Sequence, residues 1–324
     1  MIILWSLIFV ISLILLVKSA DWLIESSEKI GLAFKISPFV IGVTIIAFGT
    51  SFPELASSIA AVMKGATEIV VANVVGSNIA NIFLIVGLSA VVARHIVVKR
   101  NLIDLDAPLL ITATLIFLFF AWDKEIVLWE GIILIIAFAS YILYAFFRKR
   151  ETRTNEVLNE KEAAIEKDEK EFASQKLNFK VFFFLILGIT GLAVGANYTI
   201  ESILEISYIL GISASLIAIT AVAIGTSLPE LVVSVRACSK KKYEVALGNI
   251  FGSNVFNLLL VVGVPALIGP LKIDNLTFEI GLPFLIIATL LFVISCISRK
   301  IHLWEGLTYL LIYALFLTKL FGLF

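Results

Sequence analysis

Long apolar runs dominate the chain and predict helices that cross a membrane. A helix needs roughly 20 mostly apolar residues to span a hydrocarbon core about 30 Å thick. Ten such runs can be placed, starting near Ile2, Pro38, Ile69, Ala107, Ile126, Phe179, Ser213, Val245, Phe278 and His302. Their apolar residues are continuous instead of alternating, which excludes a membrane β-barrel. The pattern therefore predicts an all-α membrane protein with ten transmembrane helices.

The second half of the chain repeats the first. A shift of 176 residues places residues 37–87 on residues 213–263 without a gap, and 22 of these 51 positions are identical. Each half then holds five spans, so the second half must enter the membrane from the opposite side. We predict two inverted-topology repeats, at residues 1–147 and 179–324, joined by a charged linker at residues 148–178.

The distribution of lysine and arginine predicts the orientation. Alternate loops and span ends carry 21 basic residues on one side and four on the other. Because the basic side faces the cytoplasm, we expect a multi-pass protein of the cell membrane with both termini outside and the central loop cytoplasmic. The first run lacks a basic n-region, so we expect it to remain as a span. The linker is typical of a solvated segment, with a regulatory cation sensor as the alternative.

The amino-acid composition excludes several classes of protein and of binding partner. Hydrophobic residues make up 60% of the chain and charged residues 15%, with a mean hydropathy of +1.06, whereas soluble domains carry about 25% charged residues. This excludes a soluble enzyme. The 25 basic and 25 acidic residues cancel, so no nucleic-acid partner is expected. The two cysteines and two histidines lack metal-site spacing. The lipid bilayer is the expected surrounding, without an obligate protein partner.

Two polar strings interrupt the apolar runs in both halves. GTSFPEL at 49–55 returns as GTSLPEL at 225–231, and NVVGSNIAN at 73–81 returns as NIFGSNVFN at 249–257. Glu54 and Glu230 are costly there, since an acidic side chain at the bilayer centre is disfavoured by about 2.5 to 3.5 kcal/mol on insertion scales. Neither span offers a basic partner nearby, so a bound cation is the natural one.

Helical spacing places further oxygen donors beside the two glutamates. The side chains concerned are Thr50, Asn73, Ser77 and Asn81 in the first half and Thr226, Asn249, Ser253 and Asn257 in the second. Pro53 and Pro229 remove an amide donor each, which frees the carbonyls of Gly49 and Gly225, with Ala47 and Ala223 close by. Packing is favoured for Ser58 and Ser234, and either packing or ligation is open for Asn78 and Asn254.

These donors suit a hard cation. Oxygen ligands without thiol or imidazole favour calcium, which accepts six to eight of them, or sodium; magnesium demands a stricter geometry. Two carboxylates balance one calcium or two sodium ions, whereas the empty pocket would carry two unpaired charges. A site that crosses the bilayer only when filled exchanges one ion for the other. Alternatives are a proton/cation exchanger, a cation channel and a membrane enzyme, for which an activated nucleophile is missing from the strings.

At these residues the sequence resembles the sodium/calcium exchanger family of the cation/calcium antiporter superfamily, whose two alpha-repeats carry GTS-x-PE and GSN-x-x-N. The resemblance is to the prokaryotic type and implies a secondary antiporter, not an enzyme, that exchanges sodium for calcium by alternating access. Calcium and sodium would be transported substrates bound at the midplane between the repeats, with the first and sixth helices as a moving gate.

The resemblance also implies the ligands. Calcium would be held by Glu54, Glu230, Thr50 and Thr226, and sodium also by Ala47, Ser51, Ser77, Ala223, Ser227 and Ser253, with Asn81 and Asn257 completing the centre. Several relatives, including potassium-dependent ones, have Asp at one member of the last pair. Two asparagines here weaken a potassium-coupled interpretation. The central loop is too short for the calcium-sensing domains of animal relatives.

Overall fold

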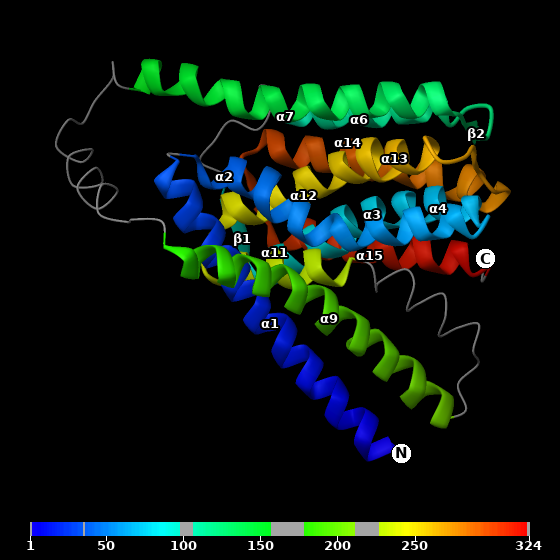
Figure 1. Cartoon of the computed structure of the whole chain (residues 1–324), viewed down its shortest axis with the longest axis horizontal. Coiled ribbons are helices and arrows are strands. Elements are labelled where there is room, and N and C mark those ends of the chain that lie inside the picture. Colours follow the sequence, from blue (N-terminus) through cyan, green and yellow to red (C-terminus); the bar gives the residue numbers. More distant parts are fainter. Residues whose placement is uncertain (1, 35, 98–105, 157–177, 211–226, 323–324) are drawn as a thin grey trace.

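Helices make up almost all of the computed structural model, which describes residues 2–34, 36–97, 106–156, 178–210 and 227–322 (Figure 1). The helices are α1 (Ile2–Ala33), α2 (Pro38–Ile41), α3 (Ala47–Met63), α4 (Thr67–Ile79), α5 (Gly87–Ala93), α6 (Asp106–Phe120), α7 (Leu128–Glu156), α9 (Phe179–Ile209), α11 (Leu228–Ser239), α12 (Tyr243–Phe256), α13 (Val262–Ala266), α14 (Leu282–Ile297) and α15 (Leu303–Leu320). Four short π-helical segments continue them: η1 (Gly42–Ile46), η2 (Ala80–Val86), η3 (Asn257–Val261) and η4 (Thr277–Gly281). The strands are β1 (His95–Val97), β2 (Glu125–Ile126), β3 (Leu271–Lys272) and β4 (Lys300–His302).

Eight of the ten predicted membrane spans correspond to long apolar helices of the structure. Within the described residues, eight helical stretches are long and apolar enough to cross a bilayer, namely Ile2–Ala33, Pro38–Met63, Thr67–Ala93, Leu128–Ala145, Phe179–Ile206, Tyr243–Ala266, Thr277–Ile297 and Leu303–Leu320. The fourth predicted run forms α6, an apolar helix of 15 residues. The seventh begins at residues 213–226, which lie outside the described residues, and continues as α11.

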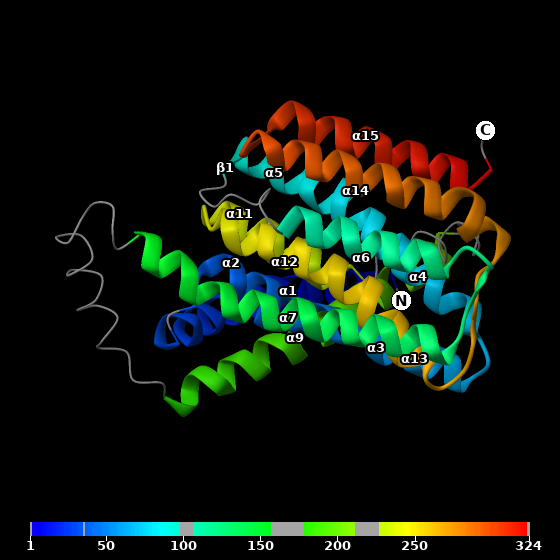
Figure 2. The same cartoon turned by 90° about the horizontal axis from the view of Figure 1, so that it is seen from above.

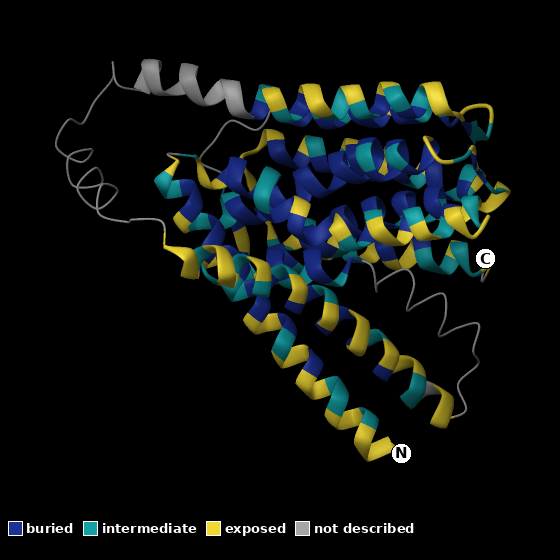
Figure 3. Ribbon diagram, viewed as in Figure 1, coloured by how far each residue is buried: buried dark blue, intermediate teal, exposed yellow. Residues whose placement is uncertain are grey.

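Helices α1 and α9 lie along each other and diverge from the rest of the molecule (Figures 1 and 2). Glycines on α9 permit this close contact. A Cβ built on Gly188 would lie 2.8 Å from the Leu23 amide nitrogen of α1, and one on Gly191 would overlap the Ser19 hydroxyl. Small residues of this kind let two helices in a membrane approach backbone to backbone. The outer faces of both helices are exposed (Figure 3).

The two halves of the chain interlock. Helix α7 of the first half packs on α13 of the second, and α15 of the second packs on α5 of the first. Glycines mark both contacts: a Cβ on Gly131 would lie 2.8 Å from the Gly263 carbonyl oxygen, and one on Gly306 would lie 2.8 Å from that of Gly87. Gly87 and Gly263 are 176 residues apart, the length of the sequence shift. The halves therefore share one core.

Two small sheets also join the halves. β1 pairs with β4 and β2 with β3, both antiparallel, so each sheet takes one strand from each half. β1 and β2 lie at opposite ends of the helical body (Figure 1).

The predicted linker begins as helix. Helix α7 continues through Glu156, so residues 148–156 of the linker are helical. Residues 157–177 lie outside the described part of the chain.

Candidate metal-ion site

Three helices bring the polar strings together in the buried centre of the body. α3 contributes Thr50, Ser51 and Glu54, α11 contributes Glu230, and α12 contributes Ser253. All five are buried, with Glu54 only 1% exposed and Glu230 0%. The two carboxylates are close enough for their negative charges to interact. Both duplicated glutamates therefore lie in the same buried region, where Ser51 of α3 also contacts Glu230.

Close backbone packing carries α12 against the helix that leads into α3. A Cβ on Gly252 would lie 2.5 Å from the Val43 carbonyl oxygen, and one on Gly248 would lie 3.0 Å from the Cα of Gly42. The spacing of Gly248 and Gly252 places them on one face of α12. Their neighbours Asn249 and Ser253 are thereby brought within hydrogen-bond reach of α3.

Hydroxyl groups connect α3 with the two helices of the second half. Ser51 Oγ donates to Glu230 Oε1 at 2.7 Å and lies 3.0 Å from Ser253 Oγ. The single Ser51 proton serves the carboxylate, so the Ser253 hydroxyl is the donor in the second contact. Thr50 Oγ1 lies 3.1 Å from Asn249 Oδ1 and 3.3 Å from the Ala47 carbonyl oxygen. These contacts form a continuous cluster of oxygen atoms.

Several buried oxygens on the polar strings and the helices that carry them have no hydrogen-bond partner within the described part of the chain. They are both carboxylate oxygens of Glu54, Oε2 of Glu230, the side-chain amide oxygens of Asn81 and Asn257, and the hydroxyls of Ser58 and Ser227. Leaving a buried carboxylate without a partner is costly. The basic residue on α11, Arg236, is paired with Asp21. The orphaned oxygens are therefore candidate ligands for a metal cation.

The donor set contains few charged ligands. Within the described residues, no group of three or more His, Cys, Asp and Glu side chains is placed to hold a metal. Beside Glu230 lie neutral oxygens instead, the Ser51 hydroxyl that donates to it and the Ser253 hydroxyl next to Ser51. Such a set fits calcium or sodium, which bind oxygen in flexible arrangements, better than a transition metal that prefers imidazole or thiolate.

π-helical turns include the last asparagine of each polar string. Asn81 lies in η2, and Asn257 is the first residue of η3. A single π turn widens the helix locally and is frequent at functional sites. Ala47 begins α3 directly after η1. Ser77 is buried on α4 and has an interaction partner of its own.

Two of the expected ligands, Ala223 and Thr226, lie outside the described residues. The same holds for the Gly225 carbonyl that Pro229 was expected to free, while α3 continues as helix through Pro53. Ser227, which directly precedes α11, is buried.

Some polar contacts at the site go beyond the expected ligand set. Asn249 Nδ2 donates to Ser234 Oγ at 3.0 Å, so Ser234 orients the amide that faces Thr50. The helical spacing of Asn249 and Ser253 already placed Asn249 on the same helix face as an expected ligand. The sequence offered no comparable sign for Ser234, because a serine in a membrane helix is commonly a packing residue. Asn78 Nδ2 donates to the Asn254 carbonyl oxygen at 3.3 Å, which links equivalent positions of the two repeats.

A family model described as "Sodium/calcium exchanger protein" matches residues 4–147 and 180–322. The chain belongs to this family. The sodium/calcium exchanger MaX1 of Methanosarcina acetivorans is 32% identical over 97% of this chain and 98% of its own length. The inner membrane protein YrbG of Escherichia coli is 29% identical over 94% of this chain and 92% of its own.

Solved structures of a sodium/calcium exchanger share the fold. NCX_Mj soaked with zero Na⁺ and Ca²⁺ is 32% identical, and the match covers 99% of this chain and 100% of that one with a TM-score of 0.80. A second structure of NCX_Mj, soaked with 2.5 mM Na⁺ and 0.1 mM Ca²⁺, has a TM-score of 0.78. Membership of a family of exchangers makes this a membrane transport protein and confirms the family named from the GTS-x-PE and GSN-x-x-N strings.

Proposed function

We propose that the chain exchanges sodium for calcium across the cell membrane by alternating access. The observation that carries this proposal is the pair of buried, mutually repelling carboxylates of Glu54 and Glu230, three of whose four oxygens have no hydrogen-bond partner among the described residues. Membership of the sodium/calcium exchanger family supports it. Calcium and sodium are then transported substrates of the site.

The ligands of the proposed site come from both halves. Glu54 and Glu230 with Thr50 and Thr226 bind calcium, and Ala47, Ser51, Ser77, Ala223, Ser227 and Ser253 add sodium ligands, with Asn81 and Asn257 at the centre. The orphaned oxygens of Glu54, Asn81 and Asn257 are the strongest support, since each gains a partner when a cation binds.

Charge balance couples the two ions. One calcium or two sodium ions neutralise the two carboxylates, whereas an empty site would carry two buried negative charges. Moving uncompensated charge through a low-dielectric region costs far more than moving a neutral cluster. The ion site therefore switches readily from one side of the membrane to the other only when it holds calcium or sodium. As a result, calcium moves in one direction when sodium moves in the other.

The proposed architecture has ten spans in two inverted repeats, residues 1–147 and 179–324, with the ions at the midplane between them. The reciprocal packing of α7 on α13 and of α15 on α5, with equivalent glycines at both contacts, supports it. So do the two sheets at opposite ends of the body. We place both termini outside and the linker, residues 148–178, in the cytoplasm, because 21 of the 25 lysines and arginines fall on that side.

Ion replacement in proteoliposomes tests the proposal. Purified protein is reconstituted into vesicles loaded with sodium, and calcium uptake is followed after dilution into sodium-free or sodium-matched buffer. We expect uptake only with an outward sodium gradient. Uptake driven by a pH gradient without sodium would instead establish a proton/cation exchanger. Calcium entry without any counter-ion would establish a channel, and either result would overturn sodium coupling.

Ser51→Ala should lower the affinity of the site for sodium without abolishing exchange. The Ser51 hydroxyl is buried and donates to Glu230, and a hydrogen bond to a charged group contributes about 1.5–3 kcal/mol. We expect the sodium concentration for half-maximal exchange to rise about tenfold. Ser57→Ala is the matched control, because Ser57 is exposed on the same helix and bonds only the Glu54 carbonyl oxygen. Equal half-maximal sodium concentrations in the two variants would show that Ser51 does not contribute to the ion site.

A further inference from the structure

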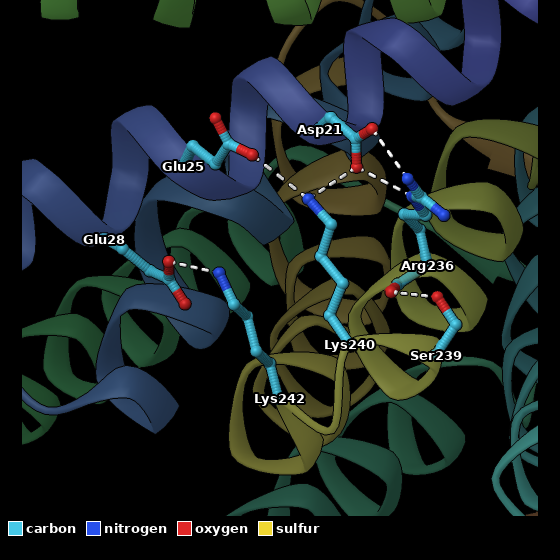
Figure 4. A network of polar contacts seen from close by, with 7 residues as sticks. All are labelled: Asp21, Glu25, Glu28, Arg236, Ser239, Lys240 and Lys242. Atoms are coloured by element: carbon cyan, nitrogen blue, oxygen red, sulfur yellow. Dashed lines mark hydrogen bonds and ion pairs between the residues drawn. The ribbon is translucent and has the colours of Figure 1, made fainter.

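Ion pairs fasten one end of α1 to α11 (Figure 4). Arg236 binds Asp21 in bidentate fashion, with Nε 2.7 Å from Oδ1 and the terminal nitrogen 2.9 Å from Oδ2. Lys240 Nζ lies 2.8 Å from Asp21 Oδ1 and 3.1 Å from Glu25 Oε1. Lys242 Nζ lies 2.5 Å from Glu28 Oε2. We call these contacts the α1–α11 ion-pair cluster.

The cluster is partly shielded from solvent. The Asp21 side chain is 16% exposed, and it accepts from two cations at once. Although burial disfavours the charged form of Lys240, its contacts with Asp21 and Glu25 raise its pKa above the ordinary value. Bidentate geometry and a shared acceptor make a network stronger than isolated surface pairs, which contribute little.

The ion-pair cluster connects α1 to a helix that carries a residue of the ion site. α11 begins two residues before Glu230 and carries Arg236 at its other end, so the cluster joins α1 to a helix of the ion site. α1 in turn is packed on α9 through Gly188 and Gly191. At the opposite end of this helix pair, the beginning of α1 and the end of α9 lie away from the body (Figure 1).

The repeat does not reproduce the cluster at that opposite end. A shift of 176 residues places Asn197 at the position of Asp21, and Ala60 at that of Arg236. Only Glu25 and Lys240 keep charged equivalents, Glu201 and Lys64. Glu201 and Lys64 both lie in the described part of the chain and are exposed, and no ion pair joins Glu201 to Lys64. Inverted repeats otherwise give both faces equivalent contacts, so the charges make the two ends unequal.

We propose that the α1–α11 ion-pair cluster is a one-sided latch that holds the ion site closed at the Arg236 end and biases the exchanger toward the state open at the other end. The inference rests on alternating access by the proposed exchanger. By the distribution of basic residues, the latched end faces the cytoplasm. Release of the latch is then the step that lets α1 and α9 move together relative to α11.

Spin-label distances test the latch without measuring transport. Labels are attached through Lys29→Cys on α1 and Ser239→Cys on α11, both exposed positions whose side chains take no part in the ion pairs. The native Cys238 and Cys296 are buried, and buried thiols in apolar surroundings are inert toward labelling reagents. Distances between the labels are measured by pulsed electron paramagnetic resonance on the full chain in lipid, with and without Asp21→Asn.

We expect one short distance with the intact cluster and a second, longer population that grows about three- to tenfold with Asp21→Asn, as expected for losing a partly buried ion-pair network. Arg236→Gln should act in the same direction but less strongly, because Lys240 still pairs with Asp21. Adding it to Asp21→Asn should change little further, because Asp21→Asn already weakens the Arg236 pair. The matched control is Glu201→Gln at the equivalent position of Glu25, which should change nothing.

The outcome separates the latch from the proposed function. Unchanged distances in folded Asp21→Asn and Arg236→Gln proteins, judged by size-exclusion elution and melting temperature, would overturn the latch and leave sodium/calcium exchange standing. Failure of the unlabelled protein to exchange sodium for calcium would overturn the proposed function, whatever the distances show.

Discussion

Glu54→Gln and Glu230→Gln are each expected to reduce sodium-driven calcium uptake by at least about 100-fold. A unit charge contributes about 4 kcal/mol at 4 Å when the effective dielectric constant is about 20, and calcium is divalent. Removing either buried carboxylate therefore removes more affinity than that reduction requires. Initial rates of calcium uptake into sodium-loaded vesicles measure the effect.

Protein stability provides the control for this loss. In the absence of ions, Gln at position 54 or 230 removes one of two repelling charges, so both variants should melt at or above the temperature of the unchanged protein. Calcium at 100 times its dissociation constant should stabilise the unchanged protein by about 2.7 kcal/mol and neither variant. Glu68→Gln, at an exposed glutamate of α4, should keep both transport and calcium stabilisation. Full uptake by either site variant would contradict the proposed ligands.

Replacing Gly248 and Gly252 together by alanine should prevent assembly of the site. The new Cβ at position 252 would lie 2.5 Å from the Val43 carbonyl oxygen and 2.6 Å from the Ala47 Cβ, and the one at 248 would overlap the Phe39 carbonyl oxygen. Backbone atoms cannot rotate away, so α12 must move. Overpacking costs about 1–3 kcal/mol per position, and here two adjacent turns are affected.

The measurements are the melting temperature and calcium-dependent stabilisation of the purified protein. We expect a lower melting temperature and no stabilisation by calcium, because Asn249 and Ser253 leave their partners on α3. Gly269→Ala is the matched control, since its Cβ would meet only the Val62 side chain at an ordinary 3.6 Å. A double variant that melts and binds calcium normally would show that this close contact does not position the site.

The helices follow from the sequence because each apolar run must satisfy its backbone groups within itself. The pairing of α1 with α9 does not follow in the same way. It depends on glycines such as Gly191, whose meaning appears only when Ser19 of the other helix is placed against it. The interlocking of α7 with α13 is likewise a property of packing, because the sequence repeat alone is compatible with two separate bundles.

At the site, duplication and the cost of a buried carboxylate were enough to single out Glu54 and Glu230 from the sequence. Spacing also indicated which serines, threonines and asparagines share their helix faces. The hydrogen bond from Ser51 to Glu230 and the role of Ser234 behind Asn249 required the structure, since they join helices separated in sequence.

The sequence by itself determined which segments are apolar enough to enter a membrane and which two carboxylates lie within such segments, because hydrophobic transfer and charge burial act residue by residue. Only the tertiary structure decided which helix faces touch and that one end of α1 is fastened by Asp21. Those contacts depend on the shapes and charges of residues far apart along the chain. The two repeats can therefore keep equivalent glycine contacts between helices while only one end of the molecule has the ion pairs.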